Sequence, residues 1–111
     1  MLKKKFKPAF EGLRNGMVHR SILTQFVLGA FAVAAGVILK ITSGEWIAVV
    51  LCIGLVITTE YLNTAIEFIC NYLTTKKDAK IKEIKDLAAG AVLVSSLTAL
   101  VTAIIILLRH I

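Results

Sequence analysis

Three long apolar stretches constrain this chain more than any other feature. They cover residues 22–39, 46–70 and 87–108, and each is close to or above the roughly 18 to 20 residues that a helix needs to cross a bilayer. Hydrophobic residues make up 58% of the 111-residue chain, more apolar surface than a water-soluble domain of this size can bury. We therefore predict an all-α integral membrane protein with three transmembrane helices, formed by a single domain over residues 1–111.

Basic residues flank these stretches unevenly and predict an orientation. The first 20 residues carry six Lys and Arg against Glu11 alone, and the connector 71–86 carries five lysines against three acids. The connector 40–45 is nearly neutral. Because Lys and Arg mark the cytoplasmic side, we expect the N-terminus and the connector 71–86 in the cytoplasm of a multi-pass cell-membrane protein. The net charge of +6 then fits an anionic membrane surface, and we expect no nucleic-acid partner.

The N-terminal segment has the pattern of an amphipathic helix over residues 6–18. Its apolar residues recur at helical spacing, while charged residues occupy the rest of the turn. A basic helix of this kind lies on a membrane surface and binds anionic lipid. We predict a surface helix that precedes the three spans.

The second apolar stretch contains the candidate catalytic and metal-binding residues. Glu60, Asn63, Thr64 and Glu67 fall within roughly a 100° arc of a helix, since successive residues rotate by about 100°. Ionisable groups inside a membrane helix are expensive, and two carboxylates with an amide on one face favour a functional site over a structural role. The stripe must face protein, water or a ligand.

A second candidate region begins the third stretch. Lys85 and Asp86 precede the small residues Ala88 to Ala91, and we place them at the N-terminus of a helix. Such an end attracts anions, and a lysine there favours phosphate. Carboxylates on the adjoining helix then suggest Mg²⁺ and phosphate chemistry. Alone, the same residues would be read as a solvated charge run.

These motifs closely resemble the prokaryotic diacylglycerol kinase family, which includes the undecaprenol kinases of Gram-positive bacteria. The match rests on Glu60-x-x-Asn63-Thr-Ala-Ile-Glu67 and on Lys85-Asp-x-Ala-Ala-Gly-Ala-Val, with an interval of 26 positions from Glu60 to Asp86. Phe6-x-x-Ala9-x-x-Gly12 resembles the N-terminal surface helix of the family, so the resemblance covers almost the whole chain. In size the chain is similar to the short Gram-positive members.

The resemblance implies a homotrimeric lipid kinase that uses ATP and Mg²⁺ to phosphorylate a lipid hydroxyl at the cytoplasmic interface. It implies that Glu60 is the general base and that Asn63 helps to hold the hydroxyl. It also implies that Glu67 binds Mg²⁺, that Lys85 neutralises the transferring phosphoryl group and that Asp86 orients Lys85 or contacts the nucleotide. The nucleotide contacts are expected to continue at Lys76, Lys77 and Asp78. Undecaprenol is the first expected substrate and diacylglycerol the second.

The chain departs from the family pattern at two positions. A second metal-binding glutamate of the family falls here on His19 or Arg20, and an aspartate near the end of the second span is replaced by Asn71. These losses leave open a member without catalysis that serves as a membrane subunit. A small proton-coupled exporter is a third hypothesis, although such a protein would be expected to have four spans.

Overall fold

The computed structural model describes residues 2–74 and 76–111, and this part of the chain forms four α-helices. They are α1 (Leu2–Gly16), α2 (Arg20–Leu39), α3 (Ser43–Leu73) and α4 (Ala79–Arg109). The last three are long and apolar enough to cross a membrane, which confirms the predicted number of spans. The N-terminal helix also forms, and it begins and ends slightly earlier than predicted.

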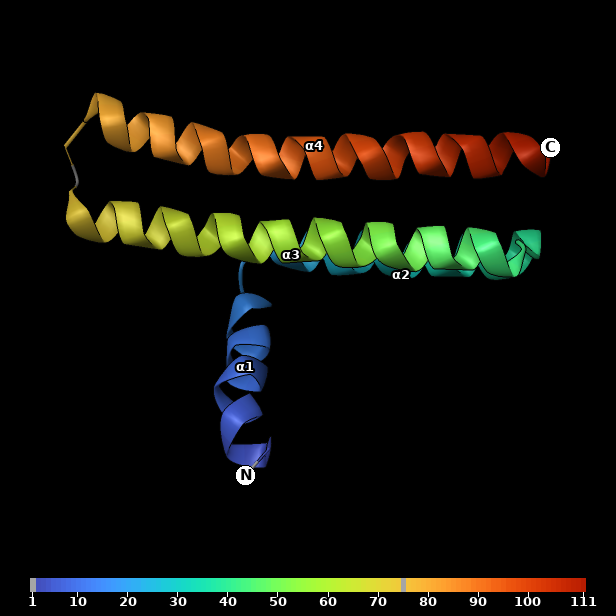
Figure 1. Cartoon of the computed structure of the whole chain (residues 1–111), viewed down its shortest axis with the longest axis horizontal. Helices are drawn as coiled ribbons and strands as arrows, with labels where there is room; N and C mark the ends of the chain where they lie inside the picture. Colours follow the sequence, from blue (N-terminus) through green and yellow to red (C-terminus); the bar gives the residue numbers. More distant parts are fainter. Residues whose placement is uncertain (1, 75) are drawn as a thin grey trace.

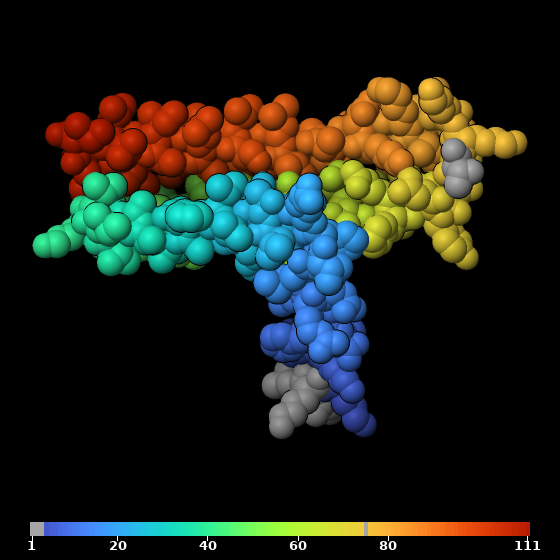
Figure 2. Space-filling model, turned by 180° about the vertical axis from the view of Figure 1, so that it is seen from behind, coloured from blue at the N-terminus to red at the C-terminus, as the bar shows by residue number. Residues whose placement is uncertain are grey.

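The spans lie lengthwise beside one another, while α1 stands apart from them. In Figure 1, α3 and α4 run antiparallel along their whole length and α2 lies behind α3. The helix α1 projects crosswise from the middle of this bundle, as the view from behind also shows (Figure 2). Most large apolar side chains of the spans are exposed on the single chain, which is the surface that lipid or further subunits would cover.

Glycines on one face of α2 let it approach α3. Gly29 and Gly36 are buried, and a Cβ added to them would come within 3.1 Å of Ile53 and 2.8 Å of Trp46, respectively. A side chain at either position would therefore push the two helices apart. Small residues commonly serve this purpose between membrane helices, where close backbone approach provides the packing energy.

Helices α3 and α4 are also joined by a polar contact. The hydroxyls of Thr59 and Ser95 are 2.9 Å apart, and both residues lie partly or fully inside the packed face. Each hydroxyl also bonds a backbone carbonyl of its own helix, from Val56 and Val92. Interhelical hydrogen bonds of this type stabilise membrane helix pairs by about 1 kcal/mol.

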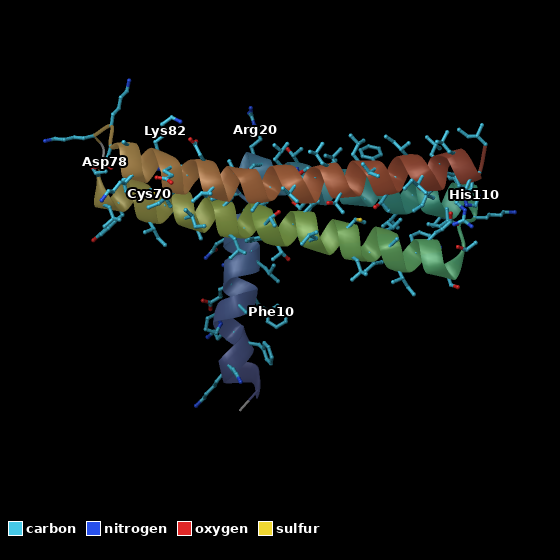
Figure 3. All side chains as sticks on the ribbon, turned by 45° about the horizontal axis from the view of Figure 1, so that its top comes forward. Phe10, Arg20, Cys70, Asp78, Lys82 and His110 are labelled. Atoms are coloured by element: carbon cyan, nitrogen blue, oxygen red, sulfur yellow. The ribbon has the colours of Figure 1, made fainter. Side chains whose placement is uncertain are left out.

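An ionic cluster closes the end of the bundle that carries the α2–α3 connector. Thr42 caps α3 in a reciprocal capping box with Glu45, whose carboxylate is buried. The same carboxylate lies 2.8 Å from His110 and 3.4 Å from Arg109 at the end of α4. Figure 3 shows His110 at one end of the bundle and Asp78 at the opposite end.

The start of α4 corrects one sequence-based expectation. Asp78 is the N-cap, and its carboxylate accepts hydrogen bonds from the backbone N–H groups of Lys80 and Ile81. The helix therefore begins at Ala79, so Lys85 and Asp86 lie about two turns inside it rather than at its N-terminus. Their placement at an anion-attracting helix end was wrong, because the unpaired N–H groups belong to the turn that Asp78 caps.

Candidate active site

The polar stripe of α3 runs from a buried to an exposed position. Glu60 is only 6% exposed, Asn63 and Thr64 are half-buried, and Glu67 is exposed. Within the described part of the chain, none of the hydrogen bonds or ion pairs uses the Glu60 carboxylate. A carboxylate without a partner in the chain is free to accept a hydrogen bond from a ligand.

Asn63 bonds to Glu67 and leaves one oxygen available. Its amide nitrogen donates a long hydrogen bond of 3.4 Å to Glu67, and its Oδ1 is buried without a partner. An unpaired buried oxygen beside a carboxylate offers the ligand type that Mg²⁺ prefers. The described residues contain no cluster of three His, Cys, Asp or Glu side chains. This donor set therefore fits an Mg²⁺ ion that also keeps phosphate oxygens and waters, as this ion commonly does.

Lys85 meets the stripe from α4. Its Nζ donates to Oδ1 of Asn71 at 2.7 Å, and Asn71 lies one helical turn beyond Glu67 on the same face of α3. The ammonium group of Lys85 is thus held at the exposed end of the stripe. Asp86 does not orient it in this structure, because the Asp86 carboxylate pairs with Lys82 at 2.6 Å.

A basic cavity of about 730 Å³ lies at the α3–α4 connector. Four of the five predicted nucleotide-binding residues line it, and Asp86 lines a neighbouring cavity. Sequence reasoning missed Lys82, which lines both; its spacing of four residues from Asp86 was the available signal. The polar residues that line the larger cavity are Asn71, Thr74, Lys76, Lys77, Asp78, Lys82 and Lys85.

Comparison with known proteins identifies the family of this chain. Residues 7–107 match the family described as prokaryotic diacylglycerol kinase. Over 95 residues the chain is 33% identical to the undecaprenol kinase of Bacillus subtilis (strain 168), covering 86% of this chain and 72% of that protein. The chain belongs to the prokaryotic diacylglycerol kinase family. It is a lipid kinase, and membership of a kinase family implies ATP as the phosphoryl donor.

The family resemblance leads one to expect a second metal-binding glutamate at the α1–α2 corner, where this chain has His19 and Arg20. His19 precedes the first residue of α2, and its ring packs edge-on against Phe68 with the centroids 5.0 Å apart. Arg20 is exposed. Phe68 directly follows Glu67, so the corner adjoins the exposed end of the stripe but brings no acid to it.

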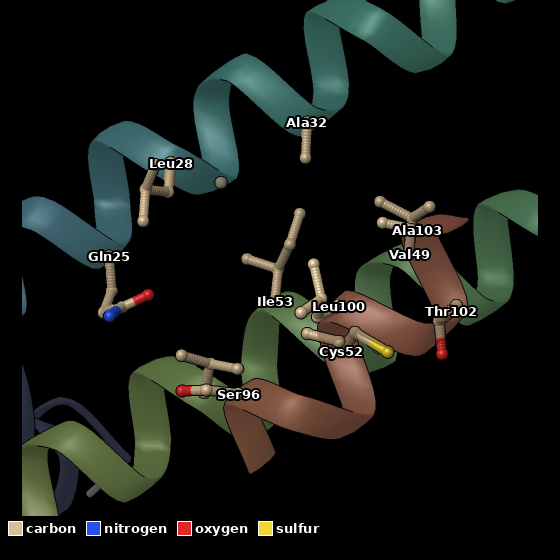
Figure 4. Close-up of a pocket in the computed structure, with 13 residues that line it drawn as sticks. Gln25, Leu28, Ala32, Val49, Cys52, Ile53, Ser96, Leu100, Thr102 and Ala103 are labelled. Atoms are coloured by element: carbon tan, nitrogen blue, oxygen red, sulfur yellow. The ribbon is translucent and has the colours of Figure 1, made fainter. Parts of the chain in front are cut away.

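An apolar cavity lies on the membrane side of the stripe. It measures about 400 Å³ and is lined by residues of all three spans. Val56, one turn from Glu60, lines it, as does Cys52 one turn further. Figure 4 shows Gln25, Ile53 and Ser96 around this space. The lining suits hydrocarbon.

Proposed function

We propose that this lipid kinase transfers the γ-phosphoryl group of ATP, with Mg²⁺, to the primary hydroxyl of a membrane lipid, undecaprenol first and diacylglycerol second. The observation that carries the proposal is the row of polar residues on one face of α3, the polar path, which runs from buried Glu60 to Asn71 and its partner Lys85. One end of this path adjoins an apolar cavity and the other a basic one. A lipid alcohol and a nucleotide need these two environments side by side. The undecaprenol kinase relative favours the polyprenyl substrate.

Glu60 is the proposed general base. The lipid hydroxyl donates a hydrogen bond to its carboxylate, and the proton passes to Glu60 as the lipid oxygen bonds to the γ-phosphorus. The bond from that phosphorus to the β–γ bridging oxygen breaks, and ADP leaves. Asn63 helps to hold the hydroxyl through its amide. Burial of Glu60 excludes water, which would otherwise compete as the acceptor.

The metal and the phosphates are assigned to the exposed end of the path. Glu67 would hold Mg²⁺, with the free Oδ1 of Asn63 as a neighbouring oxygen. The ion, when bound, neutralises charge on the ATP phosphates. Lys85 would contact the transferring phosphoryl group, and Asp86 would fix the position of Lys82. Lys76, Lys77 and Asp78 would continue the nucleotide contacts around the basic cavity.

The active form is proposed to be a homotrimer, with the basic cavity in the cytoplasm. Three thin spans do not enclose a lipid headgroup and a nucleotide, and their exposed apolar faces would be covered by neighbouring copies. The proposed surface helix α1 exposes Phe6 and Phe10 beside Lys7 and Arg14, which suits an anionic leaflet. Its position then marks the cytoplasmic interface.

The deciding experiment incubates the purified full-length protein with ATP, Mg²⁺ and each lipid in detergent micelles, followed by separation of the phosphorylated products. We expect undecaprenyl phosphate as the main product and none from Glu60→Gln. A preference for diacylglycerol would contradict the substrate assignment. No product from either lipid would favour the non-catalytic subunit, the alternative that the missing acid at His19 and Arg20 motivates.

A further inference from the structure

Helix α1 is fastened to the spans by one tyrosine of α3. The hydroxyl of Tyr61 donates to the backbone carbonyl of Leu13 at 2.6 Å. Among the described side chains, this is the only hydrogen bond between α1 and another helix. The Tyr61 ring also lies under Gly16, where an added Cβ would come within 2.0 Å of the ring carbon Cε1. The contact therefore requires both the phenol group and the absence of a side chain at Gly16.

The bonded carbonyl is one that α1 cannot satisfy by itself. The last four carbonyls of a helix lack partners within it, and Leu13 belongs to this group. Its usual partner would be the N–H of Met17, which instead bonds Arg14 at 3.2 Å. Tyr61 thus satisfies a carbonyl at the end of α1 that the helix leaves without a partner.

This contact between Tyr61 and Leu13 lies directly beside the polar stripe of α3. Tyr61 follows Glu60 in α3, and Phe68, which contacts His19, follows Glu67. The α1–α2 corner therefore packs along the flank of α3 next to the two glutamates. An edge contact to Phe26 of α2, with ring centroids 6.4 Å apart, holds the Tyr61 ring from a second side.

We propose that Tyr61 is a positioning residue that holds α1 at the level of Glu60, so that the lipid hydroxyl is presented at the depth of the carboxylate. The proposal rests on the proposed function. A basic helix with exposed Phe6 and Phe10 rests at the bilayer surface, and its attachment point then sets how deeply Glu60 sits below that surface. Reaction needs the two reacting atoms within about 3.5 Å, so a loosened α1 lowers the fraction of productively bound lipid.

Two variants and two matched controls test this. Tyr61→Phe keeps the ring and removes the hydrogen bond, and Gly16→Ala drives a methyl group into the ring. Tyr72→Phe is the control for the first, since Tyr72 lies on the same helix and is 93% exposed. Gly12→Ala is the control for the second, because a Cβ at Gly12 meets nothing within 4 Å.

Each protein is reconstituted in nanodiscs that contain anionic lipid and is assayed in two ways. The first assay measures KM for the lipid and for ATP together with kcat. The second follows tryptic cleavage after Arg14, which requires the end of α1 to open. The loss of one hydrogen bond corresponds to about a three- to ten-fold change. We expect Tyr61→Phe and Gly16→Ala to raise the lipid KM and the cleavage rate by this factor, with the KM for ATP unchanged and both controls like wild type.

Two results would overturn the proposal. One is cleavage of Tyr61→Phe at the wild-type rate, which would mean that the hydrogen bond does not hold α1. The other is faster cleavage with an unchanged lipid KM, which would mean that the position of α1 does not matter for the substrate. If the wild-type protein phosphorylates no lipid, the proposed function fails, whereas the cleavage rates still decide whether Tyr61 holds α1.

Discussion

The ammonium group of Lys85 on α4 donates a hydrogen bond of 2.7 Å to the side-chain oxygen of Asn71 on α3. The acceptor is a neutral amide, so it orients the lysine without cancelling its charge. Lys85 is therefore held in the lining of the basic cavity, and its partner in this contact carries no negative charge that would compete with a phosphate. In this chain an amide performs the orienting role at the place where the family resemblance leads one to expect an aspartate.

Removal of this amide should weaken nucleotide binding. In Asn71→Leu, Lys85 loses its acceptor and its side chain samples other rotamers, so we expect the KM for ATP to rise by about three- to ten-fold. The KM for the lipid should change little. Steady-state kinetics with each substrate varied in turn checks this, with Tyr72→Phe as the neighbouring control. An unchanged KM for ATP would show that Lys85 needs no anchor.

Hydropathy predicted the spans well because a bilayer admits few alternatives. The stretches 22–39 and 46–70 fall within α2 and α3, and α2 ends at Leu39 as predicted. The start of α4 was missed by eight residues, since the segment 79–86 is charged and a hydropathy pattern ends where charge begins. The cap at Asp78 decides this boundary, and it depends on one side chain that accepts two N–H groups.

The site was predictable only where it lies within one helix. The rotation of about 100° per residue places Glu60, Asn63 and Glu67 on one face whatever the tertiary structure. The contacts of Lys85 with Asn71 and of Tyr61 with Leu13 join different helices, and periodicity holds no information about them. For the same reason the small-residue face of α2 that meets α3 could not be chosen from the sequence.

The proposed orientation can be tested by thiol labelling. In a variant with Cys52→Ala and Cys70→Ala, a single cysteine at Lys76→Cys should be shielded from a membrane-impermeant reagent in intact cells. A cysteine at Gly44→Cys should react, because this position is exposed at the start of α3, at the opposite end of the bundle. Ready labelling at position 76 together with protection at position 44 would invert the proposed topology.

The proposed trimer predicts a defined mass. The exposed apolar faces of the spans should pair with those of other copies, and small residues allow close contact there. In a mild detergent that preserves activity, we expect native mass spectrometry or light scattering with detergent correction to give three times the mass of the chain. An active species with the mass of one chain would refute the trimer.

The cluster around Glu45 should contribute stability and not catalysis. Its buried carboxylate accepts a hydrogen bond from the N–H of Thr42 and lies 2.8 Å from His110. Glu45→Ala removes the capping box and leaves His110 without this partner, so we expect a lower free energy of unfolding than that of the wild type. Denaturant unfolding in detergent measures this, with exposed Gly44→Ala as the control.

Activity per folded molecule should persist in Glu45→Ala. Glu45 lies roughly 22 Å along α3 from Glu60 at about 1.5 Å per residue, too far for a direct effect on the reacting atoms. The variant therefore separates the stability of the bundle from its chemistry. A fall in kcat at a temperature where the variant is fully folded would show that the two ends of the bundle are coupled.

Replacement of each glutamate of the stripe by glutamine should impair a different step of the reaction. Glu60→Gln removes the proposed base while keeping the shape of the side chain, and general-base assistance is typically worth about 10² to 10⁴-fold in rate. We expect a fall of this size in kcat with ATP binding largely intact. Glu67→Gln removes the proposed metal carboxylate, so the Mg²⁺ concentration for half-maximal activity and the dissociation constant of the nucleotide should both rise.

Nucleotide binding measured by equilibrium dialysis over a range of Mg²⁺ concentrations, beside turnover at saturating lipid, separates these effects. Near-normal turnover in Glu60→Gln would show that another group takes the proton. Equal and small effects of Glu60→Gln and Glu67→Gln would show that neither carboxylate takes part in catalysis, because a base and a metal ligand act on different steps. The split between kcat and Mg²⁺ dependence is specific to the proposed roles, since a structural disturbance of α3 would lower both together.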